Sequence, residues 1–286
     1  MAKPEIDSNE FGRVLKVRGR WDALLQKKLL EENIKQLELS YSNGWRGKDL
    51  NFLEQLPDLE TLYIWDLSGL DVSGVQFLPG LKRLHVHIWK KPSQPLAFEK
   101  LASLESCEMD WNPALQSVLT CSWLKRLKIS DMKGVPSLNL AMLSELNEFW
   151  LTRAYGLEKI RFPSQSNLVE IVLRRISALR GIDSWAYVKK LTRLWLTECK
   201  QLEISSISAA AAVKELDLSN MGPIPSLRFA NDFRALETLR LSGSTEIRDG
   251  QLAFFTKLPK LKSLTFPPKG HYDLSPQKAR ELLEAR

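Results

Sequence analysis

Two short segments of the chain carry side chains that could bind a metal ion. His85 and His87 stand two residues apart in the first segment, and Glu108 and Asp110 have the same spacing in the second. If both segments are strands, each pair lies on one face of a sheet, and neighbouring parallel strands are only about 4.8 Å apart. Two imidazoles and two carboxylates brought together in this way could hold a divalent transition metal.

The same four residues have a simpler interpretation. Lys128 is expected beside Glu108 on the following strand and can pair with it. Exposed histidines next to carboxylates are also ordinary hydrogen-bonded surface groups. We therefore predict neither a metal site nor a cofactor, and we keep the four residues only as candidates for one.

The common short signatures of catalysis are absent from the sequence. There is no P-loop, no GxGxxG, no GxSxG and no HExxH. With only three histidines, the chain offers few candidates for a general base. A Ser-His-Asp assembly leaves no fixed trace in residue order, but nothing favours one, and we predict a non-enzymatic protein without catalytic residues.

The strands that would position these side chains are indicated by a hexapeptide of the form LxxLxL, which recurs about every 22 residues from Ile34 to Phe266. A period of this length is typical of stacked supersecondary units. The eleven copies begin at Ile34, Leu59, Leu81, Leu104, Leu124, Leu146, Leu168, Leu191, Val213, Leu236 and Leu261.

At these residues the chain resembles the leucine-rich repeat family, and the resemblance extends from Ile34 to about Pro267. It implies an α/β solenoid: a curved, right-handed superhelix with a parallel β-sheet on the concave face and short irregular or 3-10 segments on the convex face. Most relatives bind other proteins, and the family has no shared catalytic residues. The family's usual asparagine, three positions after the hexapeptide, is kept only at Asn112, so we expect less regular turns.

The residues themselves predict the same sheet. The fourth and sixth positions of each hexapeptide are apolar while the fifth varies, which is the alternation of a half-buried strand. A second apolar position, as in residues 69–72 and 156–160, is expected to close the core from the outer side. The leucines expected to stack on one another include Leu62, Leu84, Leu127, Leu194, Leu216 and Leu239.

Stacked repeats expose apolar ends that need covers. At the N-terminus we predict a strand over Arg13–Val17 and an amphipathic helix over Trp21–Asn33. At the C-terminus, Ser275 is a good N-cap and Pro276 suits the first helical position. No linker divides the chain, so we expect one elongated domain. Its parts are an N-terminal cap (1–33), a leucine-rich repeat solenoid (34–267) and a C-terminal cap helix (268–286).

Composition predicts where the protein works. The first residues lack the apolar stretch of a secretory signal, and no run approaches the ~18 apolar residues of a membrane span. Cys107, Cys121 and Cys199 form no CxxC pair, so we expect reduced and mostly buried thiols. We predict a cytoplasmic protein that does not enter a membrane, or one exported by a specialised system without a cleavable signal.

Four large aromatic residues fall at positions that the alternation assigns to solvent, three at the fifth position of a hexapeptide and Trp65 two residues further on: Tyr63, Trp65, Trp150 and Trp195. Exposed aromatics beside arginines are typical of interface hot spots. The alternative is that isolated surface tryptophans pack on neighbouring side chains. Because all four fall on one face, we favour a binding surface. Five other tryptophans lie in caps or connecting segments and are expected in the core: Trp21, Trp45, Trp89, Trp123 and Trp185.

Basic residues are concentrated between residues 153 and 193. This segment has nine basic and three acidic residues, an excess of six positive charges against a formal +7 for the whole chain. A basic patch beside exposed tryptophans would attract an acidic surface. Four of the arginines are expected on or beside the concave face: Arg153, Arg174, Arg175 and Arg193.

These features predict a protein-protein interaction module that binds an acidic or phosphorylated protein partner on its concave face and acts as a monomer. An intracellular adaptor, a toxin-neutralising immunity protein and an effector all fit. The alternative is a nucleic-acid-binding repeat protein that uses the basic segment 153–193. Carboxylates elsewhere on the face would repel a long polyanion, so we do not expect nucleic acid. A solvated charge cluster without a partner is the remaining interpretation. The predicted partner-binding residues are Tyr63, Trp65, Trp150, Arg153, Arg174, Arg175, Arg193 and Trp195.

Overall fold

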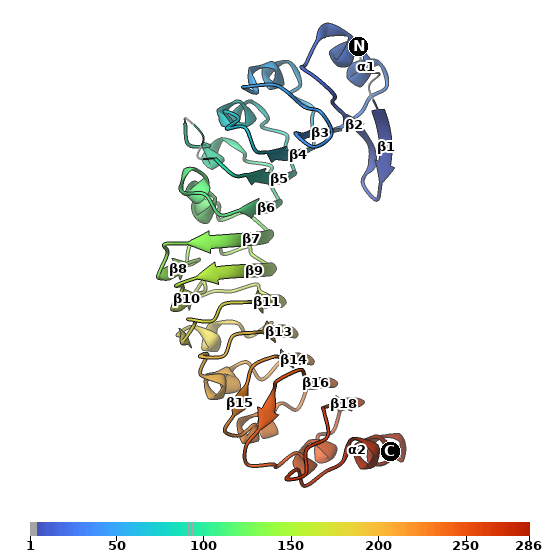
Figure 1. Cartoon of the computed structure of the whole chain (residues 1–286), viewed down its shortest axis with the longest axis vertical. Helices are drawn as coiled ribbons and strands as arrows, with labels where there is room; N and C mark the ends of the chain where they lie inside the picture. Colours follow the sequence, from blue (N-terminus) through green and yellow to red (C-terminus); the bar gives the residue numbers. More distant parts are fainter. Residues whose placement is uncertain (1–4, 91, 93) are drawn as a thin grey trace. The chain divides into compact units, whose positions relative to one another are not determined.

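The computed structural model describes residues 5–90, 92 and 94–286. The chain forms two compact units, residues 1–129 (unit 1) and residues 130–286 (unit 2). In both units each repeat contributes one strand to a parallel sheet and returns through an outer segment (Figure 1). The boundary at residue 129 falls inside a repeat strand, where no change of composition marks it. The three-part division at residues 33 and 267 stays a prediction.

Unit 1 begins with an antiparallel hairpin whose second strand starts the parallel sheet (Figure 1). Strand order follows the sequence: β1 (Glu5–Asn9), β2 (Gly12–Lys16), β3 (Gln36–Ser40), β4 (Thr61–Asp66), β5 (Arg83–Ile88) and β6 (Ser106–Asp110). The connections hold α1 (Ala23–Glu31) and the 3-10 helices η1 (Asn51–Gln55), η2 (Ser73–Phe77), η3 (Phe98–Lys100) and η4 (Pro113–Thr120).

β7 (Arg126–Lys133) crosses the boundary between the units. In unit 2 the main sheet continues through β9 (Glu148–Tyr155), β11 (Glu170–Arg174), β13 (Arg193–Thr197), β14 (Glu215–Ser219), β16 (Thr238–Ser242) and β18 (Ser263–Thr265). Two small outer sheets contain β8 (Ser137–Asn139), β10 (Lys159–Arg161) and β12 (Gly181–Ile182), and β15 (Pro223–Ile224) and β17 (Glu246–Ile247). The remaining elements are η5 (Trp185–Tyr187), η6 (Ile204–Ala209), η7 (Arg228–Asp232), η8 (Ala253–Lys257) and α2 (Pro276–Glu284).

The core follows the hexapeptide pattern. The six leucines predicted to stack are all buried, and strand register aligns Leu194 with Leu216 and Leu216 with Leu239. The second apolar position is buried as well, for example at Val72 and Ile160. The three cysteines are free and buried. Burial raises the pKa of the Cys121 and Cys199 thiols to about 12, so neither is a ready nucleophile.

Both predicted end helices are present. Asp22 caps α1 by accepting hydrogen bonds from the backbone N–H groups of Leu24 and Leu25. The Ser275 hydroxyl caps α2 by accepting from the Lys278 N–H at 3.1 Å. The apolar stripe of α1 is narrower than expected, because Leu25 and Leu29 are buried while Leu24 and Leu30 are exposed.

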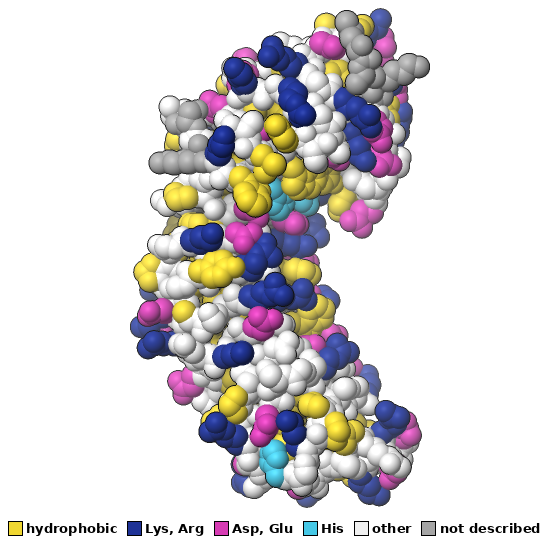
Figure 2. Space-filling view, in the orientation of Figure 1, with side chains coloured by type: hydrophobic (Ala, Val, Ile, Leu, Met, Phe, Trp, Pro, Cys, Tyr) yellow, Lys and Arg dark blue, Asp and Glu magenta, His cyan; other side chains and the backbone are white. Residues whose placement is uncertain are grey.

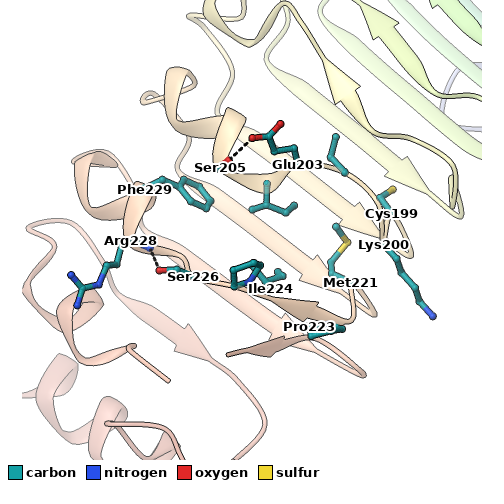
Figure 3. Close-up of a pocket in the computed structure, with 13 residues that line it drawn as sticks. Cys199, Lys200, Glu203, Ser205, Met221, Pro223, Ile224, Ser226, Arg228 and Phe229 are labelled. Carbon is teal, nitrogen blue, oxygen red and sulfur yellow. Dashed lines mark hydrogen bonds between the residues drawn. The ribbon is translucent and has the colours of Figure 1, made fainter. Parts of the chain in front are cut away.

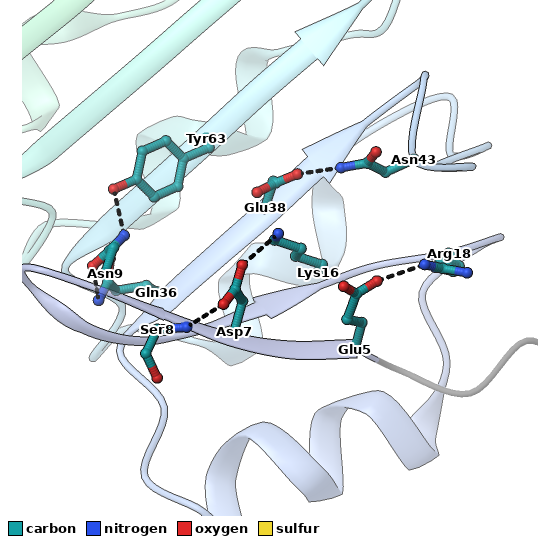
Figure 4. A network of polar contacts seen from close by, with 10 residues as sticks. All are labelled: Glu5, Asp7, Ser8, Asn9, Lys16, Arg18, Gln36, Glu38, Asn43 and Tyr63. Atoms are coloured by element: carbon teal, nitrogen blue, oxygen red, sulfur yellow. Dashed lines mark hydrogen bonds and ion pairs between the residues drawn. The ribbon is translucent and has the colours of Figure 1, made fainter.

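The predicted N-terminal strand is confirmed as β2, but its hairpin partner β1 was not predicted. β1 has almost no buried side chain. It pairs with β2 through the antiparallel backbone ladder. Surface ion pairs also join the two segments, with Lys16 2.7 Å from Asp7 and Arg18 2.5 Å from Glu5 (Figure 4). A strand of this kind carries no apolar alternation by which it could be recognised.

One of the five tryptophans expected in the core was wrongly placed. Trp45 and Trp185 are buried, and Trp21 and Trp123 are half-buried, whereas 79% of Trp89 is exposed. Trp89 directly follows Ile88, which fills the core at the end of β5, so the next side chain points outward. The core of the following segment is filled by Leu96 and Phe98 instead.

A column of left-handed residues follows the repeat strands of unit 2, one position before the place of the family's asparagine. One residue per repeat, two positions past the hexapeptide, has φ between 52° and 61°. The N–H groups of Arg175, Glu198 and Asn220 each donate to a carbonyl at the end of the next strand, so the turn extends the sheet ladder by one bond. The column consists of Asp131, Arg153, Arg175, Glu198, Asn220 and Gly243.

We expect Asn220→Val to lower the free energy of unfolding by about 2 kcal/mol, because a β-branched side chain is poorly tolerated at positive φ. The change also removes the Asn220 Oδ1 atom that accepts the Ser244 N–H at 3.1 Å. Urea unfolding followed by circular dichroism measures the loss. Arg175→Asn is the matched control and should change stability by less than about 0.5 kcal/mol, since its ion pair is exposed. Equal stabilities of the two variants would contradict this account of the column.

Candidate interaction surfaces

Trp150 and Trp195 lie on the solvent side of the unit 2 sheet, on strands β9 and β13, and strand β11 runs between these two strands. Strand register pairs Val172 of β11 with Trp150 of β9 and with Trp195 of β13. Val172 occupies a position that faces solvent, yet its side chain is fully buried. Its neighbours on both sides in the sheet are the two indoles, which are themselves half-buried. The three side chains therefore form a continuous apolar strip across three strands, called here the tryptophan strip.

A buried carboxylate fixes one end of the tryptophan strip. Only 4% of Glu170 is exposed. Its Oε1 accepts a hydrogen bond of 2.7 Å from the Trp150 indole, and its Oε2 lies 3.0 Å from the Arg193 guanidinium. A buried carboxylate is stabilised when its oxygens have partners of this kind. Glu170 thus joins side chains from three successive strands, a role that sequence reasoning missed.

Most of the arginines expected beside the tryptophans are already paired with carboxylates. Arg153 forms a bidentate pair with Asp131 through two contacts of 2.6 Å. Arg175 lies 3.6 Å from Glu198, and Arg193 pairs with Glu170 as described above. Arg174 is exposed and has no ion pair within the described part of the chain. The arginines lie where the repeat register placed them, but their charge is largely balanced locally.

The basic excess of residues 153–193 is divided between two sides of unit 2. Lys159 and Arg161 belong to the outer strand β10, where Ile160 between them faces the core. Arg180 precedes the outer strand β12, and Lys189 and Lys190 follow η5. All five are exposed. The charge that the sequence assigned to one segment is therefore not gathered on the face that carries the tryptophan strip.

Unit 1 has its own aromatic cluster on the solvent side of the sheet. Tyr63 stacks on His85 with ring centroids 4.6 Å apart, and Trp65 lies over His87 at 5.8 Å. Along β4 the rings of Tyr63 and Trp65 are 5.7 Å apart and nearly parallel. We call these four side chains the aromatic floor. Figure 2 shows the histidines of unit 1 (cyan) against hydrophobic side chains (yellow).

The carboxylates expected beside the histidines are in place on β6. Glu108 lies 3.6 Å from His85 and 4.0 Å from His87, and Asp110 lies 3.2 Å from His87. Lys128 reaches Glu108 at 3.8 Å, as expected from the register. Among the residues that the structure describes, no group of three or more His, Cys, Asp or Glu is arranged to hold a metal ion. Burial lowers the pKa of His85 below its usual value, although the neighbouring Glu108 opposes this shift.

A pocket of about 530 Å³ opens on the outer side of unit 2 (Figure 3). The pocket lies at the gap between the two small outer sheets, one of which ends at β12 while the other begins at β15. Pro223 and Pro225 have no amide hydrogen to continue such a ladder. The pocket wall is mainly apolar and includes Leu202, Ile204, Met221, Ile224 and Phe229. None of the residues predicted to bind a partner lines it.

Comparison with solved structures identifies the fold. The chain is similar to an internalin from Listeria monocytogenes, with 16% identity, a TM-score of 0.51, and coverage of 92% of this chain and 69% of that one. It is also similar to a leucine-rich repeat protein of Leptospira interrogans, with 18% identity, a TM-score of 0.53, and coverage of 93% and 63%. The chain thus spans less than two thirds of the Leptospira protein. No protein-family model and no curated protein matches the sequence.

These likenesses, together with the parallel sheet and its repeated register, show that the chain has the leucine-rich repeat fold. The fold expected from the LxxLxL hexapeptides is confirmed. Sequence identity below 20% to both solved structures carries no residue roles with it. Within the described residues, no helix has both the length and the apolar character needed to cross a membrane.

Proposed function

We propose that this protein is a non-enzymatic module that binds another protein on the solvent side of its repeat sheet, with the tryptophan strip of unit 2 as the main contact. The observation that supports it is the full burial of Val172 between two half-exposed indoles on neighbouring strands, which gives the solvent side of the unit 2 sheet a continuous apolar strip. Large aromatic side chains with charged neighbours dominate the energetics of protein interfaces.

The partner is proposed to present an acidic or phosphorylated surface. Arg174 supports this, because it is exposed next to the strip and forms no ion pair among the described residues. Arg193 and Arg240 are also partly exposed, although each already contacts a carboxylate. The charge available to a partner is smaller than the sequence suggested, so the strip supplies most of the affinity and Arg174 adds selectivity.

Nucleic acid is the weaker candidate. The aligned positions across the strands that carry the strip are Glu148, Glu170, Arg193 and Glu215, so the single arginine in this row offsets only one of three carboxylates. The remaining negative charge of Glu148 and Glu215 opposes a long polyanion. We further propose that the protein acts as a monomer in the cytoplasm, or after export by a specialised system, where its three buried thiols stay reduced.

Removal of the strip is expected to abolish partner capture. Trp150→Ala combined with Trp195→Ala should reduce recovery of a specific protein partner from nuclease-treated native lysate by at least about 30-fold, since hot-spot residues contribute about 2 kcal/mol or more. Quantitative mass spectrometry of the captured proteins measures the change. Trp89→Ala is the matched control, because it removes a more exposed tryptophan that lies outside the sheet.

Two further arms separate binding from folding. The double variant loses one hydrogen bond to Glu170, so circular dichroism must show that it remains folded. Arg174→Glu, which breaks no ion pair among the described residues, should lower capture of an acidic partner by about tenfold. Undiminished capture by the folded double variant would show that another surface binds. Capture that disappears with nuclease treatment would favour nucleic acid.

A further inference from the structure

The aromatic floor of unit 1 is bordered by carboxylates, whereas arginines border the tryptophan strip of unit 2. Tyr63, Trp65 and His87 present nearly parallel rings, with interplanar angles of 4° and 5° between successive pairs. Trp65 is the most accessible of the four residues, with 37% of its surface exposed. The faces of such rings carry negative electrostatic potential and attract cations.

The N-terminal hairpin forms one side of this surface. The Asn9 side chain donates to the Tyr63 hydroxyl at 3.2 Å and to Gln36 at 3.1 Å, so the hairpin turn reaches across two strands to β4 (Figure 4). The turn also carries Glu10, whose charge, like that of Glu38, contributes to the raised pKa of Tyr63, for which burial is the main cause. Two carboxylates, Glu10 in the hairpin turn and Glu38 on β3, thus act on Tyr63.

The carboxylates of Glu108 and Asp110 border the opposite side of the floor, within 4.0 Å of the histidine rings. The cations nearby are already engaged. Arg83 lies over the Phe11 ring at 4.2 Å, and Lys128 contacts Glu108. Four carboxylates therefore surround an aromatic surface that has three neighbouring cations, the third being Lys16, which is aligned with Glu38 and paired with Asp7. The surface is therefore negatively charged when the histidines are neutral. The four carboxylates are Glu10, Glu38, Glu108 and Asp110.

We propose that the aromatic floor and its bordering carboxylates bind the guanidinium group of an arginine side chain on a basic segment of a partner protein. A guanidinium is planar, so it can stack on Trp65 while its N–H groups donate to Glu108 or Asp110. An acidic segment is repelled by the same carboxylates. The inference does not depend on the function proposed for unit 2, since all its residues belong to unit 1.

The test uses Nα-acetyl-arginine amide and its neutral analogue Nα-acetyl-citrulline amide with the full chain at neutral pH. Saturation-transfer NMR reports binding of either probe, and the Trp65 indole resonance locates it. We expect saturable binding of the arginine probe with a shift of the Trp65 resonance, and at least about tenfold weaker binding of the citrulline probe, because only the first carries a charge.

Variants distinguish this site from general attraction to an acidic protein. Glu108→Gln combined with Asp110→Asn should weaken arginine binding about tenfold, and Trp65→Leu should do the same. Glu54→Gln combined with Asp183→Asn removes the same charge from exposed positions elsewhere and should leave binding unchanged. The proposal is overturned if the citrulline probe binds equally well, if the control variant loses as much affinity, or if the arginine probe leaves Trp65 unshifted.

Discussion

Replacement of Gly74 by alanine is expected to lower the free energy of unfolding by about 3 kcal/mol, the upper part of the range for overfilled cores. A Cβ atom at this position would lie 2.4 Å from the Leu50 carbonyl oxygen and 2.5 Å from its carbonyl carbon. Both atoms belong to the backbone of the preceding repeat, which cannot rotate away as a side chain could. Gly74 therefore sets the separation of two successive outer turns, η1 and η2.

Urea unfolding followed by tryptophan fluorescence measures this loss. Gly270→Ala is the matched control, because a Cβ atom there meets nothing within 4 Å and Gly270 is not left-handed. The control should change stability by less than about 1 kcal/mol and can raise it, since alanine restricts the unfolded chain. If Gly74→Ala unfolds at the same urea concentration as the unaltered protein, η1 and η2 do not approach each other this closely.

Leu194→Ala is expected to destabilise unit 2 by about 3 kcal/mol, a typical cost of a cavity left by a buried leucine. Leu194 is fully buried, and strand register aligns it with Ile171 on one side and Leu216 on the other. In a repeat fold each unit contacts mainly its neighbours, so the loss should be greatest in adjacent repeats. Hydrogen exchange should accelerate most at the amides of β11, β13 and β14.

Thr197→Ala provides the control on the same strand. Thr197 is half-exposed on the solvent side of β13, so its truncation should change stability by less than about 0.5 kcal/mol. Equal acceleration of exchange in unit 1 and unit 2 by Leu194→Ala would contradict the expectation of local effects. Comparison of the two variants separates the cost of a cavity from the cost of any substitution in β13.

The main sheet and its register could be predicted because the same residue pattern recurs in every repeat. Once the hexapeptides are aligned, residues far apart in sequence become neighbours, and the contact of 3.6 Å between His85 and Glu108 follows. β1 could not be predicted in this way. Its contacts are the backbone ladder to β2 and surface ion pairs such as Asp7 with Lys16, and both can be recognised only when the hairpin is already known.

The candidate surfaces were predicted less completely than the sheet. The repeat register placed Trp150, Trp195 and the arginines on the correct side, but it did not predict the charge available there. Asp131 precedes Arg153 by 22 residues, one full repeat, so their pairing was accessible to the same alignment. The prediction that Trp89 packs in the core was wrong for a different reason. Its segment lies outside the hexapeptides, where no repeated pattern distinguishes an inward side chain from an outward one.

The buried carboxylate of Glu170 has a consequence for how the tryptophan strip would meet a partner. By accepting from Trp150 and contacting Arg193, it restricts the rotamers of two long side chains before any partner arrives. Ordering a side chain of this kind at an interface otherwise costs about 0.5–1.5 kcal/mol. The strip is therefore preorganised in the free protein, and a partner of matching shape could dock on it as on a rigid body.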